Sequence, residues 1–177
     1  MKFEVRDGIV VSDPCYNGET LGYCSATFDK VVPGMWSGKA IMSDEGAWGM
    51  RCKELVAFAP STFSSLVYWL MSEHEICVDS GQAGIFDKQD FLDHQHERDY
   101  GTDDWYSKMC DLSYDEKRGL RAGSYEYGVN ASSGYGDGGY SLYYATDNDG
   151  RVCALRIVFI DENEYDDYEG GDEYEDN

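Results

Sequence analysis

The sequence predicts an α+β fold, in which a twisted, mostly antiparallel sheet of about six to nine strands carries one or two packed helices. Short segments rich in β-branched and aromatic residues recur towards both ends of the 177-residue chain and are separated by turn residues. Residues 151–160 are apolar on both faces, which is typical of a central strand that is covered on both sides. Two segments near the middle, at about 62–72 and 87–94, instead begin with helix-capping residues.

The N-terminal residues are predicted to form a β-hairpin. Phe3 and Val5 alternate with charged residues, Asp7-Gly8 is a turn pair, and the strand pattern resumes at Ile9. The strand pattern then returns over residues 22–32, 35–42, 48–58, 76–78 and 124–129.

Two helices are expected in the middle of the chain. Ser61 can cap a helix over about 62–72, whose apolar residues recur at helical spacing and should cover one face of the sheet. Asp87 can cap a second helix that runs through about His94. A further short helix is expected around 105–110.

The C-terminal third returns to strands. Residues 140–145 and 151–160 flank the turn sequence at 147–150, which predicts a β-hairpin. We expect residues 1–160 to form a single domain and residues 161–177 to be a disordered acidic tail.

The formal net charge of −21 restricts the partners of the chain. Ten of the seventeen residues from Asp161 to Asn177 are acids, and the body of the chain is acidic as well. Such a field repels nucleic acid and anionic membranes and attracts basic surfaces. The charge therefore favours a basic protein partner over direct nucleic-acid or membrane binding, and leaves the oligomeric state open.

The six cysteines, at positions 15, 24, 52, 77, 110 and 153, show no Cys-x-x-Cys pair. The N-terminal residues also lack the apolar segment of a signal peptide. We therefore expect a cytoplasmic protein whose thiols are reduced and mostly buried.

Three short motifs, Ser12–Tyr16, Val78–Gly84 and Gly134–Tyr140, place an aspartate beside residues that bend the backbone sharply. If the three turns converge, they form a site that binds a nucleotide or a sugar without catalysis. In such a site Tyr16 and Tyr140 would stack on the ligand. The candidate ligand-binding residues are Asp13, Tyr16, Asp79, Ser80, Gly81, Asp137 and Tyr140.

An enzyme is the weaker alternative. The three aspartates could hold a divalent cation that activates water, which would make the protein a metal-dependent hydrolase. Cys15 could also act as a nucleophile if a base lowered the pKa of its thiol. We expect no catalytic residue and no cofactor other than that cation.

The acidic tail carries tyrosines among its acids, a pattern that can imitate nucleic acid towards a basic groove. We therefore favour a non-enzymatic binding protein that engages a basic partner, such as a nucleic-acid mimic or an inhibitor of host defence made by a phage or mobile element. The candidate partner-binding residues are Glu162, Glu164, Tyr165, Asp166, Asp167, Tyr168 and Glu169.

The order of the three motifs resembles a family of uncharacterised bacterial and phage proteins that share Asp-Pro-Cys-Tyr, Val-Asp-Ser-Gly and Gly-Asp-Gly-x-Tyr. The segment from Gly136 to Phe159 also resembles the C-terminal part of the domain of unknown function DUF4241. The resemblance covers about residues 8–160 and implies a shared site at the motif residues, with no established activity.

Overall fold

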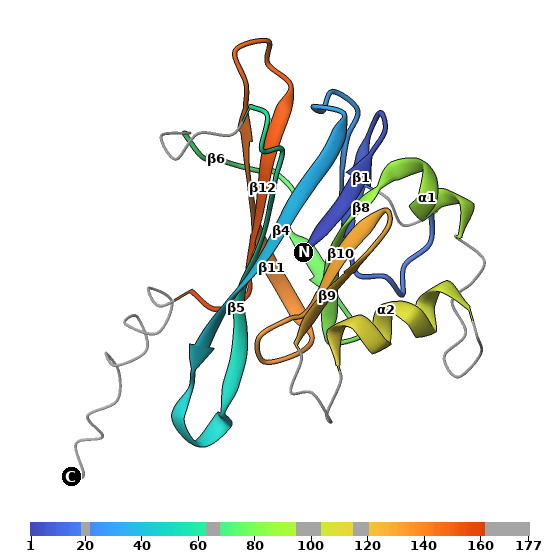
Figure 1. Ribbon diagram of the computed structural model, residues 1–177. Helices are drawn as coiled ribbons and strands as arrows, with labels where there is room; N and C mark the ends of the chain where they lie inside the picture. The colour runs from blue at the N-terminus through green and yellow to red at the C-terminus, as the bar shows by residue number, and fades with distance from the viewer. Residues whose placement is uncertain (19–21, 63–67, 95–103, 115–120, 162–177) are drawn as a thin grey trace, which may run out of the picture.

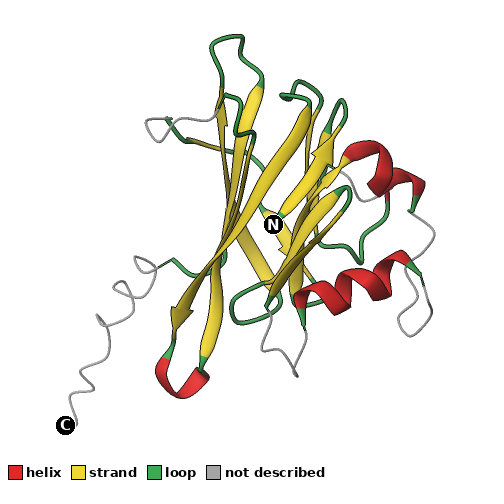
Figure 2. Cartoon of the chain, in the orientation of Figure 1, coloured by secondary structure: helices red, strands yellow, loops and turns green. Residues whose placement is uncertain are grey.

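The computed structural model describes residues 1–18, 22–62, 68–94, 104–114 and 121–161, and shows a β-sandwich with two helices on one side (Figures 1 and 2). Two sheets enclose one core, to which both contribute buried side chains. The helices lie on the outer face of the smaller sheet. Strands therefore dominate over helices, and the α+β prediction holds only in its coarse form.

The larger sheet has seven strands, and β12 lies near its middle, between β5 and β11. All of its named strand pairs are antiparallel. This position confirms the prediction that residues 151–160 form a central strand. In order, the strands are β1 (Lys2–Val5), β4 (Gly34–Asp44), β5 (Met50–Phe58), β12 (Val152–Val158), β11 (Gly138–Thr146) and β6 (Leu70–Met71), with β7 (Ile76–Val78) also paired to β11.

The smaller sheet has five antiparallel strands: β3 (Ala26–Phe28), β2 (Ile9–Ser12), β8 (Gln82–Asp87), β10 (Gly128–Ser132) and β9 (Ala122–Tyr125). Every residue of β8 is buried. One face of β8 packs into the core between the sheets, and the other lies under the helices. Two covered faces explain why this strand carries almost no charge.

The two sheets approach closely near Gly38 of β4. A Cβ atom at this position would lie only 3.0 Å from Cγ2 of Val129 on β10. The core around this contact includes Trp36, Leu55 and Ile85, all with no exposed surface. Close packing of this kind tolerates no extra methyl group without displacing its neighbours.

Helices α1 (Lys88–Asp93) and α2 (Trp105–Ser113) cover a second apolar cluster. The ring centroids of Phe86 and Phe91 lie 5.3 and 5.6 Å from that of Trp105. Aspartates begin both helices, because Asp87 accepts from the Asp90 N–H group and Asp104 accepts from the Ser107 N–H group. The helices expected at 87–94 and 105–110 are thus confirmed, and the second is longer than expected.

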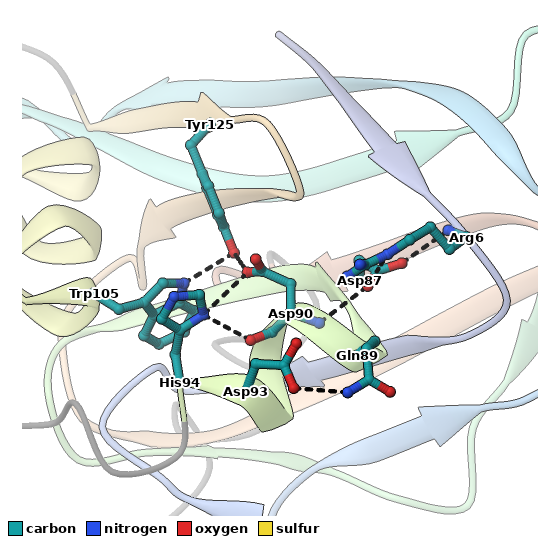
Figure 3. A network of polar contacts seen from close by, with 8 residues as sticks. All are labelled: Arg6, Asp87, Gln89, Asp90, Asp93, His94, Trp105 and Tyr125. Carbon is teal, nitrogen blue, oxygen red and sulfur yellow. Dashed lines mark hydrogen bonds and ion pairs between the residues drawn. The ribbon is translucent and has the colours of Figure 1, made fainter.

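A partly buried ion pair fixes the start of α1 (Figure 3). The Arg6 guanidinium binds the fully buried Asp87 carboxylate, which also accepts the backbone N–H of Arg6 at 2.8 Å. Burial opposes ionisation of Asp87, but these hydrogen bonds outweigh it and lower the pKa of the carboxyl group. The chain leaving β1 is thereby tied to the helix end of the smaller sheet.

A second carboxylate, Asp90, joins α1 to β9 and α2 (Figure 3). It accepts a short hydrogen bond from the Tyr125 hydroxyl, which in turn accepts from Nε1 of Trp105 at 3.0 Å. The His94 ring stacks on Trp105 with its centroid at 5.8 Å. Burial, followed by the charge of Asp90, raises the pKa of Tyr125, so this phenol stays protonated and donates.

Three sequence predictions are wrong. Strands β1 and β2 do not form a hairpin, because β1 pairs with β4 in the larger sheet and β2 with β3 and β8 in the smaller one. Residues 68–72 are not helical, since β6 pairs with β11; the remainder of the predicted 62–72 helix, at 63–67, lies outside the described residues. The strands form two sheets, of seven and five strands, rather than the single predicted sheet of six to nine strands. Two sheets form because side chains from both pack into one shared core.

The expectation of six reduced thiols is also wrong. Cys24 and Cys77 form a disulfide across 53 residues of sequence, and the Cys77 N–H group donates to the Cys24 carbonyl. Cys24 precedes β3 of the smaller sheet, whereas Cys77 lies in β7 and pairs through β11 with the larger one. The bond therefore connects the two sheets.

Neither described helix has the length and apolar character that crossing a bilayer requires.

The Asp87→Asn variant should lose the ion pair with Arg6 and keep the helix cap. Because the pKa of Asp87 is lower in the folded protein, ionisation stabilises the fold at every pH above the unfolded value of about 4. That contribution is lost as the pH falls through the folded value. We expect a cost of roughly 2 kcal/mol in unfolding free energy at pH 7, shrinking below about pH 4.

Urea unfolding at pH 7, 5, 4 and 3 measures this difference. The control is Asp29→Asn, which removes an exposed partner of Lys88 and should cost less than about 1 kcal/mol. A difference between wild type and Asp87→Asn that stays constant over this pH series would contradict the assignment.

Candidate functional site

The first two predicted turns meet at the buried carboxylate of Asp13. Asp13 follows β2 and has no exposed surface. Its carboxylate accepts the N–H groups of Asp79 and Ser80 at 2.9 and 2.8 Å, and the Ser80 hydroxyl at 2.5 Å. It also accepts the N–H group of Cys15 at 2.7 Å. Four donors from two motifs therefore satisfy one buried charge.

The third turn joins the same junction. The Asp137 carboxylate accepts the N–H group of Gly81 at 3.0 Å, and the Ser133 N–H group donates to the Gly81 carbonyl at 3.0 Å. Gly81 has a φ of 67°, a conformation that favours glycine. The pairing of β7 with β11 brings residues 76–78 beside the end of the third motif, at residues 138–140.

The two tyrosines of the motifs donate to the turns: Tyr16 joins the first turn to the second, and Tyr140 closes the third. The Tyr16 hydroxyl donates to Asp79 at 2.6 Å. The Tyr140 hydroxyl lies 2.6 Å from the carbonyl oxygen of Gly136 and 3.0 Å from that of Ser133, and its ring packs on Phe159. Burial, followed by the hydrogen bond to Asp79, raises the pKa of Tyr16 and keeps it a donor.

The structure therefore brings all three motifs together, but most of their functional groups face one another. Asp13, Asp79 and Asp137 accept hydrogen bonds from neighbouring turns, and the phenols of Tyr16 and Tyr140 donate within the junction. Of the seven predicted ligand-binding residues, Ser80 and Gly81 line the adjoining pocket. The role of the seven in binding a ligand stays a prediction.

The adjoining pocket has a volume of about 310 Å³. Its walls are residues 80–82, the end of α2 with Tyr114, and the loop 132–136. Two arginines, Arg51 of β5 and Arg121 just before β9, complete it. Four elements distant in sequence therefore meet around one concave space, as ligand sites commonly do.

Arg51 and Arg121 differ from the other arginines that the structure describes. Neither forms an ion pair with a described carboxylate, whereas the remaining three, Arg6, Arg151 and Arg156, all do. The Arg51 guanidinium lies 5.9 Å from the ring centroid of Tyr135, and its Nε donates to the Trp48 carbonyl at 3.1 Å. The Arg121 guanidinium lies 5.2 Å from the ring centroid of Tyr114. Aromatic rings and a carbonyl position these cations, and no carboxylate in the described part of the chain compensates their charge.

A buried amide network forms one side of the pocket. Oε1 of Gln82 accepts from the Ser113 hydroxyl and from Nδ2 of Asn130, both at 2.6 Å. Nε2 of Gln82 lies 3.2 Å from Sγ of Cys110. These contacts hold the end of α2 against β8 and β10 at this wall of the pocket.

Sequence reasoning missed Arg51, Arg121, Tyr114 and Tyr135. The sequence shows that an arginine is present, but whether a carboxylate neutralises it depends on the fold. One signal was available, because residues 80–82 and 134–136, which line the pocket, belong to two of the predicted motifs. A pocket beside the junction of these motifs is bounded in part by residues next to them.

Cys15 is poorly suited to nucleophilic attack. Burial, followed by the negative charge of Asp13, raises the pKa of its thiol well above the ordinary value. Among the described residues, no three His, Cys, Asp or Glu side chains gather in a way that could hold a metal ion. The partner-binding candidates at 162–169 lie outside the described residues.

A family model described as "Protein of unknown function (DUF4241)" matches residues 7–157, so the chain belongs to that family. The match includes all three motifs and the pocket, beyond the C-terminal segment in which the resemblance to this domain was first identified. The bacterial or phage origin suggested by the motifs stays a prediction. No curated protein and no solved structure matches the chain.

The Asp13→Asn variant should strongly destabilise the protein. An asparagine amide replaces one of the two carboxylate oxygens by an NH₂ group, and each oxygen accepts two hydrogen bonds, so two of the four donors lose their acceptor. We expect a loss of about 3 kcal/mol or more in unfolding free energy, measured by urea denaturation. The matched control is Asp137→Asn, an exposed carboxylate with one hydrogen bond from Gly81, which should cost about 1 kcal/mol or less. Equal losses in the two variants would contradict the role of Asp13 as the centre of the junction.

Proposed function

We propose that this protein binds a small anionic ligand, carrying a phosphate or carboxylate group, in the pocket between residues 80–82 and 132–136. One observation carries the proposal: the two described arginines without a carboxylate partner line the same pocket. In a chain with a net charge of −21, acids are available to neutralise an arginine almost anywhere on the surface. Two cations in one concavity that no described carboxylate compensates are therefore best explained by an anion that binds there.

The chemistry of the two side chains suits this role. A guanidinium presents a planar set of N–H donors that matches a carboxylate or phosphate, and its hydrogen bonds to an anion are charge-assisted. The contacts of Arg51 with Trp48 and Tyr135, and of Arg121 with Tyr114, hold the donors in place before a ligand arrives. Such preorganisation reduces the entropy lost on binding.

The motif residues support the site indirectly. Asp13 fixes the turn at 79–80, and Asp137 fixes Gly81, so the wall of the pocket keeps its shape. The function is therefore closest to the small-ligand binding that the three turns suggested, with arginines rather than the aspartates as the principal ligand-binding groups. Metal-dependent hydrolysis lacks a cluster of ligands among the described residues.

The binding test uses sodium phosphate and sodium citrate, compared with sodium chloride at equal ionic strength. Both anions should raise the melting temperature of the wild-type protein, because a ligand that binds only the folded state stabilises it. Arg51→Gln and Arg121→Gln should each weaken binding about tenfold or more in calorimetric titrations, since each removes charge-assisted hydrogen bonds.

The matched control is Arg156→Gln, which also removes one positive charge but breaks an ion pair with Glu54 away from the pocket. Its affinity for either anion should equal that of the wild type. The proposal fails if neither anion stabilises the protein beyond chloride, or if Arg156→Gln weakens binding as much as the pocket variants.

A basic protein partner is a separate proposal that rests on the acidity and tyrosines of residues 162–169. An inhibitor or nucleic-acid mimic of this kind, acting in the cytoplasm, would associate rapidly at low salt and weaken as salt rises. Pull-downs from lysate with the full chain and with a chain that lacks residues 161–177 test whether the tail binds the partner. If both forms recover the same basic proteins, the tail is not the binding surface.

A further inference from the structure

We infer that the anionic ligand is a mononucleotide, whose phosphate binds Arg51 and Arg121 and whose base stacks on the exposed ring of Trp48. The inference rests on the proposed function, since it names the ligand of the same pocket.

Trp48 is an exposed tryptophan beside the pocket. It lies in the short 3₁₀ helix Gly46–Trp48, at the turn between β4 and β5, and 69% of its surface is exposed. Its ring centroid lies 6.4 Å from that of Tyr135, at an interplanar angle of 82°, and its carbonyl accepts from Arg51. Both of these neighbours line the pocket. Trp48 therefore positions Arg51 through its backbone carbonyl and also presents an exposed aromatic ring next to the pocket.

The turn that carries Trp48 is held in place. The Tyr135 hydroxyl donates to the Glu45 carboxylate at 2.5 Å, and the Glu45 N–H group donates to the Gly49 carbonyl at 3.1 Å. These contacts join the β4–β5 turn to the loop 132–136. Trp48 is therefore held next to the pocket before a ligand binds, so stacking of a base on its ring costs little conformational entropy of the protein.

The pocket is small, and two of the residues that line it adjoin Trp48. A volume of about 310 Å³ lies at the small end of the range for ligand pockets and suits one small ligand. Arg51 and Tyr135 line the pocket and are also the neighbours of Trp48, so the base of a nucleotide whose phosphate binds there can extend to the Trp48 ring. An aromatic ring at that position gives the base a stacking partner that accepts any of the four bases.

The charge of the chain selects a single nucleotide over a strand. Two arginines neutralise the phosphate in the pocket, but a strand carries a further charge at every nucleotide. Those phosphates would face a protein with a net charge of −21. We therefore expect little gain in affinity when the nucleotide is extended into an oligonucleotide.

The test compares adenosine 5′-monophosphate, ribose 5-phosphate and a twelve-residue deoxyadenosine strand by calorimetric titration of the full chain. The nucleotide should bind about tenfold more tightly than ribose 5-phosphate, because the base adds a stacking contact. Trp48→Ala should abolish this difference, because it removes the ring and keeps the backbone carbonyl that accepts from Arg51, and Trp48→Phe should restore part of it. Tyr23→Ala, which removes another exposed aromatic ring, serves as the control and should change neither affinity.

Two results overturn the inference without affecting the proposed function. In the first, ribose 5-phosphate and the nucleotide bind equally in the wild type. In the second, the strand binds more tightly per molecule than the nucleotide. If no phosphate compound binds and neither phosphate nor citrate stabilises the protein, the proposed function itself fails.

Discussion

The arrangement of the pocket end of this protein depends on one buried charge. The Asp13 carboxylate has no exposed surface, so it must find its hydrogen bonds within the protein, and four donors from residues 15, 79 and 80 supply them. This requirement brings the end of β2 against the turn that follows β7. Asp137 extends the same arrangement to the third motif through Gly81. The pocket then forms where the joined turns meet α2 and β5.

The parts of the fold that the sequence predicted are those set by local chemistry or by burial on two faces. Asp87 caps α1 because its side chain reaches an N–H group three residues away, which requires no knowledge of the fold. β12 is central because it is apolar on both faces. The N-terminal hairpin failed for the opposite reason. The alternation of Phe3 and Val5 with charged residues is compatible with a strand paired to β2 or to β4. Which of the two strands β1 pairs with depends on the core that the two sheets share.

The candidate site was also predicted from the sequence only in part. Glycines, prolines and aspartates mark the three turns in the sequence, and they do lie together in the structure. Their aspartates support the site from within. The cations that face the pocket come from β5 and from the segment before β9, at positions that no local pattern distinguishes. In the proposed function, Arg51 and Arg121 bind a ligand because no described carboxylate neutralises them, and this property appears only in the folded protein.

The bond between Cys24 and Cys77 bears on how the sandwich opens. It connects the segment before β3 in one sheet to β7, which pairs with the other sheet, immediately before the turn that Asp13 holds. A sandwich without such a link can open transiently by parting its sheets at either end. Here the crosslink closes one end, so partial opening must begin at the other. The segments that surround the pocket, although far apart in the sequence, therefore stay together while the other end of the sandwich opens.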